Sequence, residues 1–171
     1  GIRLPNRIYG GDQELKRRAG TENVPGIAGF GQAVAEVQAE SKADLQAKYT
    51  DFQKIILSRL DESGVAYEVN SPLTGLVSHH VLNLRLNGLS TYVLLANLDL
   101  AGFAVSGGSA CTAGSLTPSH VLTAMFGQDS PKVSESIRIS FGRYNTVEEV
   151  EAFAAALVKV ARKLQDRKRE D

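Results

Sequence analysis

The sequence has few of the residues that build cross-links and metal centres: one cysteine, Cys111, and three histidines in 171 residues. A single cysteine excludes an internal disulfide framework and a cysteine-rich zinc site, so we expect a reducing, cytoplasmic compartment. The chain also lacks net charge, because 19 basic residues balance 19 acidic ones. No apolar run approaches the roughly 18 residues of a membrane span. We therefore expect no direct binding to nucleic acid and no contact with a membrane.

Glycine, proline and apolar spacing divide the chain into three expected regions. Residues 1–25 are rich in Gly, Pro, Asn and Arg and should form an irregular interface arm that depends on its neighbours for order. Apolar residues at three- and four-residue spacing predict one long helix over residues 26–63, which suits a connection between two bodies. Residues 64–171 form the third region, a small C-terminal domain. Because the chain opens on Gly1 and its first residues hold no folding nucleus, we expect a piece of a longer protein.

The fold class predicted for residues 64–171 is α+β. Alternating apolar residues predict strands at residues 65–69, 82–86, 103–105 and 137–141. Helices are predicted from Ser90 to Gly102, from Thr117 to Gly127, and after a capping box formed by Thr146 and Glu149. We expect a short, mostly antiparallel sheet packed with helices.

The lone cysteine lies in a segment of small residues, SGGSACTAG at 106–114. This composition predicts a flexible loop in which Cys111 is reachable and can act as a nucleophile. An unperturbed thiol is only about 3% thiolate at pH 7, so a working nucleophile needs a cation, a helix N-terminus or a cofactor nearby. The alternative is an adventitious loop cysteine. A hydrolase pair of Cys111 with His120 is conceivable, but a histidine at a helix start is more often a local hydrogen-bond donor.

Arg138 is the second residue that points to chemistry, because it lies on the polar face of a predicted strand. Its planar guanidinium suits a carboxylate held by two parallel hydrogen bonds, and the alternative is a surface arginine on a half-buried sheet. Arg143, in a turn, is interpreted as structural. His79 and His80 are adjacent and would face opposite sides of a strand, so they make a poor metal pair and we expect no metal site.

Three segments carry a resemblance to a known family: GGDQELKRRAGTENVPGIAGFG at 10–31, SGGSACTAGSLTPSHVL at 106–122 and ESIRISFGRYNTVEEV at 135–150. In this order they resemble the C-terminal half of a cysteine desulfurase, in the class V aminotransferase group of fold-type I pyridoxal phosphate enzymes. The cysteine loop resembles the branch related to iron–sulfur and tRNA-thiolation desulfurases. The resemblance implies conversion of L-cysteine to L-alanine, with the sulfur carried as a protein persulfide.

The resemblance also implies site residues, a cofactor and partners. Cys111 would be the thiolate and persulfide carrier, and Arg138 would hold the substrate carboxylate. Thr21 would bind the phosphate of pyridoxal 5'-phosphate in the partner subunit of a homodimer. A protein sulfur acceptor, either an iron–sulfur scaffold or a tRNA thiolase, is the further partner that the family implies.

The chain departs from the family in one respect. The family attaches its cofactor to a lysine in a His-Lys segment of the N-terminal half, and no lysine here has that setting. We therefore expect this chain to lack the attachment lysine and to be inactive alone. Two alternatives stand beside the desulfurase: a cofactor-free persulfide carrier or binding module, and another class V aminotransferase or lyase. The cysteine loop argues against the last alternative, because those reactions need no protein thiol.

Overall fold

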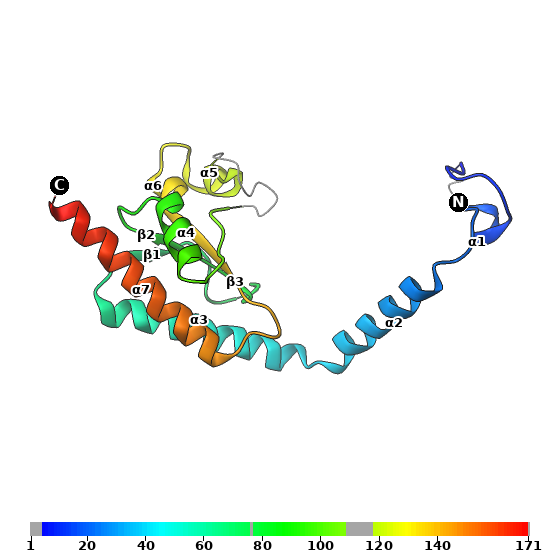
Figure 1. The fold of residues 1–171 in the computed structure, drawn as a ribbon, viewed down its shortest axis with the longest axis horizontal. Coiled ribbons are helices and arrows are strands. Elements are labelled where there is room, and N and C mark those ends of the chain that lie inside the picture. The colour runs from blue at the N-terminus through cyan, green and yellow to red at the C-terminus, as the bar shows by residue number, and fades with distance from the viewer. Residues whose placement is uncertain (1–4, 76, 109–117, 171) are drawn as a thin grey trace. The chain divides into compact units, whose positions relative to one another are not determined.

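The structure is a computed structural model that describes residues 5–75, 77–108 and 118–170, with side chains described up to residue 167. The chain divides into two compact units, Gly1–Ser41 and Lys42–Asp171. Figure 1 follows the chain from the first unit, in blue, to the C-terminal helix, in red. The division falls inside the region predicted as one long helix, residues 26–63, rather than at either of its ends.

The first unit contains the short helix α1 (Gln13–Lys16) and the longer helix α2 (Val24–Ala39). The side chain of Asn23 caps α2 by accepting a hydrogen bond from the backbone N–H of Gly26 at 3.1 Å. Pro25 occupies the first turn, where its missing N–H costs nothing. No residue of α2 is buried, so capping and helix propensity support this helix rather than packing.

The prediction of one continuous helix over residues 26–63 is wrong. After α2 ends, Glu40 has an extended backbone with φ −80° and ψ 129°. A second helix, α3, covers Lys42–Ser63. The sequence places Ser41 three residues before Asp44, which is the residue pattern of a helix N-terminus. A new helix therefore begins where the first ends, and α3 belongs to the second unit.

The second unit contains a three-stranded antiparallel sheet in the order β1-β2-β3. Its strands are β1 (Tyr67–Val69), β2 (Val81–Leu86) and β3 (Ser136–Ser140). The strands predicted at 65–69, 82–86 and 137–141 are confirmed, with ends shifted by no more than two residues. Buried and half-buried side chains alternate along β2, so the sheet has one apolar and one polar face.

The strand predicted at residues 103–105 is wrong. Phe103 and Val105 pack against the core, but the pairing of this stretch with β3 is one isolated bridge between Ser106 and Arg138. The backbone N–H of Phe103 instead donates to the carbonyl of Leu98 at 2.9 Å. The stretch is therefore tied to the end of the preceding helix rather than to the sheet.

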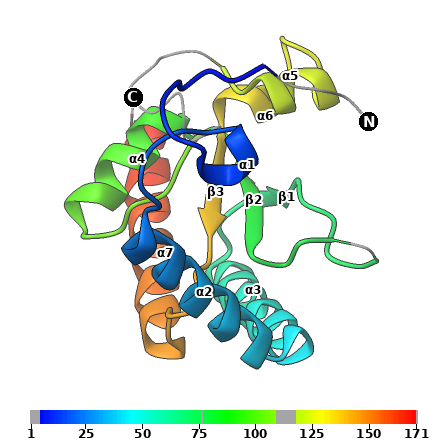
Figure 2. The same cartoon turned by 90° about the vertical axis from the view of Figure 1, so that its right-hand side faces the viewer.

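Besides α3, the described part of the second unit contains the helices α4 (Thr91–Leu100), α5 (His120–Phe126), α6 (Pro131–Ser134) and α7 (Val147–Glu170). Helix α7 packs against both α3 and α4, as Figures 1 and 2 show. Apolar side chains of these three helices and of the sheet form one core, among them Phe52, Ile56, Leu60, Leu84, Leu94, Ile137 and Leu157. No helix in the described ranges is both long and apolar enough to cross a membrane.

The predicted signals at helix ends are confirmed at two places. At the start of α7, the backbone N–H of Thr146 donates to Glu149 Oε2 at 3.1 Å, and the backbone N–H of Glu149 donates to Thr146 Oγ1 at 3.3 Å. These reciprocal bonds are a capping box. Gly127 follows the last residue of α5 with φ +88°, a conformation that glycine adopts without strain. Local chemistry therefore sets where these helices begin and end.

Candidate functional site

The predicted nucleophile Cys111 lies within 109–117, outside the described residues. The residues on either side of this segment lie against each other, since a Cβ built on Gly108 would be 3.1 Å from the Cβ of Ser119. Ser119 caps α5, where its Oγ accepts a hydrogen bond from the N–H of Leu122 at 3.4 Å. The chain is therefore held together at the two ends of the cysteine segment.

Gly107, just before the segment, lies against the first turn of α4. A Cβ on Gly107 would be 2.5 Å from Cγ2 of Thr91, which is closer than real side chains approach. Thr91 is buried, and its hydroxyl bonds to the carbonyl oxygens of Ser134 at 2.8 Å and Ser136 at 2.9 Å. Only glycine fits this position without displacing a well-anchored side chain.

Arg138 lies on β3, next to the start of the cysteine segment. Its backbone N–H donates to the carbonyl oxygen of Ser106, and the N–H of Ser106 donates to the Arg138 carbonyl oxygen at 3.1 Å. Cys111 follows Ser106 by five positions, and a chain of five residues spans at most about 18 Å. The structure therefore brings Arg138 close in space to the point from which the cysteine segment leaves the sheet.

The Nε atom of Arg138 is buried and, among the described residues, has no hydrogen-bond partner. A buried donor without a partner costs about 1–3 kcal/mol, and more when the group is charged. Arginine cannot escape this cost by losing its proton. A bound anion, such as a carboxylate that accepts from Nε and a second guanidinium N–H, would remove the cost.

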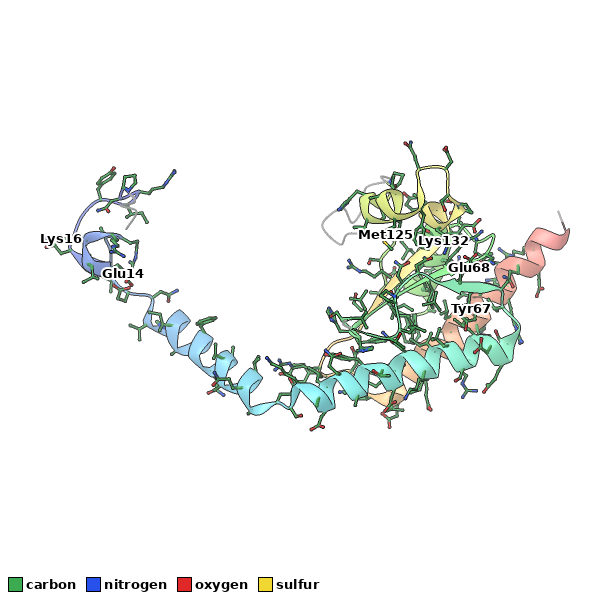
Figure 3. All side chains as sticks on the ribbon, turned by 180° about the vertical axis from the view of Figure 1, so that it is seen from behind. Glu14, Lys16, Tyr67, Glu68, Met125 and Lys132 are labelled. Atoms are coloured by element: carbon green, nitrogen blue, oxygen red, sulfur yellow. The ribbon has the colours of Figure 1, made fainter. Side chains whose placement is uncertain are left out.

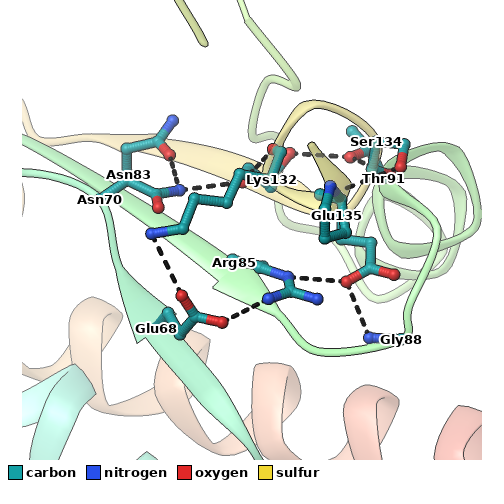
Figure 4. Close-up of polar contacts among 11 residues, drawn as sticks. Glu68, Asn70, Asn83, Arg85, Gly88, Thr91, Lys132, Ser134 and Glu135 are labelled. Atoms are coloured by element: carbon teal, nitrogen blue, oxygen red, sulfur yellow. Dashed lines mark hydrogen bonds and ion pairs between the residues drawn. The ribbon is translucent and has the colours of Figure 1, made fainter. Parts of the chain in front are cut away.

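The other arginine on this face, Arg85, is fully paired. Figure 4 shows its guanidinium between Glu68 and Glu135, with Nε 2.8 Å from Glu135 Oε2. Lys132 Nζ lies 3.1 Å from Glu68 Oε2, and Figure 3 also shows these two side chains together. Glu135 Oε2 accepts a further bond from the N–H of Gly88 at 2.9 Å. Two cations thus balance two carboxylates, which marks this group as structural and contrasts with Arg138.

The pKa shifts agree with that pairing. The hydrogen bond from Lys132, followed by that from Arg85, holds the pKa of Glu68 below its ordinary value. Burial lowers the pKa of Arg85, but the bonds and charges of Glu135 and Glu68 outweigh burial and raise it. Both residues therefore stay charged across the physiological range, and neither is suited to proton transfer.

Thr21 belongs to the first unit, where its side chain is exposed. Arg18 organises the backbone around it, because Nη1 donates to the carbonyl oxygens of Gly20 at 2.7 Å and Thr21 at 3.4 Å. The second guanidinium nitrogen of Arg18 forms an ion pair with Glu22. The segment predicted to bind phosphate is thus ordered locally.

The remaining candidates play smaller parts. His120 is exposed at the start of α5, and His80 Nδ1 lies 2.6 Å from the hydroxyl of Ser78. The carbonyl oxygen of Arg143 accepts a bond from Lys48 at 2.7 Å, so the Arg143 turn is linked to α3. In the ranges that the structure describes, no three His, Cys, Asp or Glu residues gather as a metal site would require.

Sequence reasoning missed Asn83, the neighbour of Arg138 on β2. The signal was available, because an asparagine inside the apolar pattern VLNLRL needs hydrogen-bond partners and is depleted in strands. Which partners it has depends on the register between β2 and β3, and the sequence does not specify that register.

The comparisons with known proteins point in one direction. The family model described as aminotransferase class-V matches residues 3–153. The putative cysteine desulfurase IscS 1 of Bacillus subtilis (strain 168) is 50% identical over 163 residues, covering 95% of this chain and 42% of that protein. The cysteine desulfurase IscS of Methanosarcina thermophila is 36% identical over 172 residues, covering 97% of this chain and 40% of that protein.

Solved structures agree with these sequence matches. A structure described as a NifS-like protein superposes with a TM-score of 0.71 at 30% identity, covering 96% of this chain and 40% of the other. The NifS-like protein from Rickettsia africae ESF-5 has a TM-score of 0.66 at 28% identity, with 93% and 40% covered. The chain thus spans about 40% of the length of the relatives that it matches.

Proposed function

Because this chain belongs to the aminotransferase class-V family, we propose that it is the C-terminal part of a cysteine desulfurase. The enzyme converts L-cysteine to L-alanine and carries the sulfur as a persulfide on Cys111. The observation that supports this most directly is the buried Nε of Arg138, without a partner among the described residues. It lies at the bridge to Ser106, where the chain enters the cysteine segment.

The proposed roles of Arg138 and Cys111 follow from their chemistry. Arg138 binds the substrate carboxylate through Nε and a second guanidinium N–H, which fixes the orientation of the amino acid. The thiolate of Cys111 forms a bond to the substrate sulfur while the Cβ–S bond of the substrate breaks. The carbon skeleton leaves as alanine after it gains a proton. Arg138 is held in a strand because orientation needs a rigid donor.

Pyridoxal phosphate is implied by the family, and each of the two units offers one group of the kind that the cofactor or its substrate needs. Arg138 offers the amino acid a buried Nε that has no partner among the described residues, and the exposed Thr21 offers a hydroxyl for the cofactor phosphate in the partner subunit of a homodimer. When bound, the cofactor would supply the electron sink that the reaction needs while the Cβ–S bond of the substrate breaks. The ammonium group of Lys132 is paired with Glu68, and that of Lys48 with a backbone carbonyl. We place the attachment lysine in the other part of the enzyme, without which this chain is inactive.

The persulfide needs a recipient. We propose a protein acceptor, an iron–sulfur scaffold or a tRNA thiolase, since a persulfide on a loop can be passed to another protein thiol. A single cysteine in the chain suits transfer in a reducing compartment such as the cytoplasm, because no second thiol of the chain competes for the sulfur.

The test is persulfide formation in the complete enzyme. With L-cysteine, intact mass spectrometry should show one added sulfur atom on Cys111, and Cys111→Ser should abolish both this adduct and sulfur transfer. Arg138→Ala should weaken cysteine binding by about 2–4 kcal/mol, as expected for a truncated charged pair. Arg59→Ala is the matched control, because Arg59 is an exposed arginine of α3 with only a loose ion pair to Glu62 at 3.6 Å.

Two results would count against the proposal. Sulfur transfer that survives in Cys111→Ser would show that the nucleophile is elsewhere. Persulfide formation on the 171-residue chain from an external persulfide donor, with no effect of pyridoxal phosphate in the complete enzyme, would favour the cofactor-free carrier.

A further inference from the structure

Asn83 and Arg138 form a cross-strand pair on the polar face of the sheet. The backbone N–H and C=O of Arg138 both bond to Ser106, on the side away from β2. The carbonyl oxygen of Asn83 accepts from the N–H of Asn70 at 2.9 Å, and its N–H donates to Ser71 Oγ at 2.8 Å, both away from β3. Asn83 and Arg138 are therefore a non-hydrogen-bonded pair, the type whose Cα atoms are only about 4.5 Å apart.

The side-chain amide of Asn83 is held by Asn70. Asn70 Nδ2 donates to Asn83 Oδ1 at 2.8 Å, a bond that Figure 4 shows. The same atom donates to Ser136 Oγ at 2.9 Å. Asn70 follows β1, and Ser136 is a fully buried residue of β3. The Asn70 amide thus links all three strands at the position beside Arg138.

The direction of the Asn83 amide follows from counting protons. The hydroxyl of Ser136 has one proton, and it donates that proton to the carbonyl oxygen of Lys132 at 2.6 Å. Ser136 Oγ must then accept from Asn70. The NH₂ group of Asn70 therefore faces both Ser136 Oγ and the side-chain amide of Asn83. Asn83 must in turn present its oxygen to Asn70. Its Nδ2 donors therefore face away from β1, toward the side on which Arg138 lies.

Both members of this cross-strand pair carry side-chain donor groups, and two donors cannot satisfy one another. Asn83 Nδ2 and Arg138 Nε are both donors, and the Arg138 Nε is buried and, within the described ranges, without a partner. A carboxylate has four acceptor positions and can receive bonds from both residues. Resting on the function proposed above, we propose that Asn83 is a second binding residue for the α-carboxylate of the substrate, with Asn70 and Ser136 as its positioning residues.

The decisive variant is Asn83→Asp in the complete enzyme, because it keeps the size of the side chain and can still accept from Asn70. It replaces the Nδ2 donor with a carboxylate oxygen that repels the substrate carboxylate and competes for Arg138. We expect KM for L-cysteine to rise by more than 100-fold while kcat changes by less than threefold. Asn83→Ala, which only removes the donor, should raise KM by about 10- to 100-fold, as for one hydrogen bond to a charged group.

Equilibrium binding gives a second measurement that does not depend on turnover. The affinity for L-alanine, the product with the same carboxylate, should fall in Asn83→Asp by a factor similar to the rise in KM. Asn70→Ala should give a smaller loss in the same direction, because it frees the Asn83 amide without removing it. The control is Asn97→Asp on α4, whose Nδ2 bonds to the carbonyl of Val93 at 2.8 Å. It should leave both constants unchanged.

Two outcomes would overturn this assignment. They are an unchanged KM in Asn83→Asp, whether or not kcat falls, or loss of folding in Asn83→Asp on its melting curve. The second would show that Asn83 serves the sheet alone. If the parent enzyme forms the Cys111 persulfide while either of these is found, the desulfurase function stands and only the role of Asn83 fails. If the parent forms no persulfide, the function itself fails.

Discussion

Helices α2 and α3 have similar apolar spacing but differ in what covers it. Five large apolar side chains of α2 are exposed: Val24 by 64%, Ile27 by 59%, Phe30 by 73%, Val34 by 38% and Val37 by 47%. Helix α3 instead buries Tyr49, Phe52, Gln53, Ile56 and Leu60. The difference shows that a periodic stripe identifies the apolar face of a helix, while burial depends on whether another element of the same chain packs on it.

The largest expected effect comes from replacing a phenylalanine by alanine on the packed helix α3. Phe52 is 1% exposed, and its ring centre lies 5.5 Å from that of Phe141 in an edge-to-face contact. Phe52→Ala should lower the free energy of unfolding of the second unit by about 3–5 kcal/mol, because it leaves a cavity in a close-packed core. Urea denaturation followed by circular dichroism measures this. A loss below about 1 kcal/mol would mean that α3 is no better packed than α2.

A smaller effect is expected at the cap of the unpacked helix. Asn23→Ala removes the side-chain bond to the N–H of Gly26, and cap loss costs about 1 kcal/mol of helix stability. Because α2 buries no residue, the cost should appear as lower helicity of residues 24–39 in carbon chemical shifts. Shifts of α3 should not move. A loss of helicity spread over both helices would show that the two units fold as one.

The capping box of α7 is the corresponding cap on a packed helix, and its contribution to stability should depend on pH. Hydrogen bonds from Asn145 and then from the N–H of Thr146 hold the pKa of Glu149 below its ordinary value. A carboxyl with a lowered folded pKa contributes stability that is present above its unfolded pKa and is lost as pH falls through the folded pKa. The melting temperature of Glu149→Gln should therefore lie below that of the parent at neutral pH. The gap should close in acid, and a gap that does not vary with pH would contradict this.

The smallest effect is expected for Phe30→Ala on α2. Phe30 is 73% exposed, and exposed substitutions usually change stability by no more than about 0.5 kcal/mol. The unfolding free energy of the second unit should match that of the parent within this margin. A loss of several kcal/mol, comparable to that in Phe52→Ala, would remove the contrast between the two helices.

Much of the second unit could be predicted from local patterns. Leucines at every second position predicted β2, and the Thr146–Glu149 pair predicted the start of α7, because both signals lie within a few residues of the chain. The prediction failed where local patterns compete. Ser41 interrupted a helical stripe that otherwise continued, and residues 103–105 have the composition of a strand but bond to α4.

The candidate site was only partly accessible from the sequence. The residue types of Cys111, Arg138 and Thr21 and the motifs around them led to the family, and the comparisons support that family. The sequence did not distinguish Arg138 from Arg85, since both lie on the polar face of a strand. The structure separates them, because Arg85 has two carboxylate partners and the Nε of Arg138 has none among the described residues.

The amino-acid sequence by itself determined the strand faces, the helix caps and the family, because these depend on interactions between residues close together in the chain. Only the tertiary structure decided that Asn83 pairs with Arg138 across the strands and that Asn70 donates a hydrogen bond to the amide oxygen of Asn83. The physical reason is that these residues come from distant segments. They meet through the antiparallel register of β1, β2 and β3, which is set by the burial of the leucine and isoleucine faces against α3, α4 and α7.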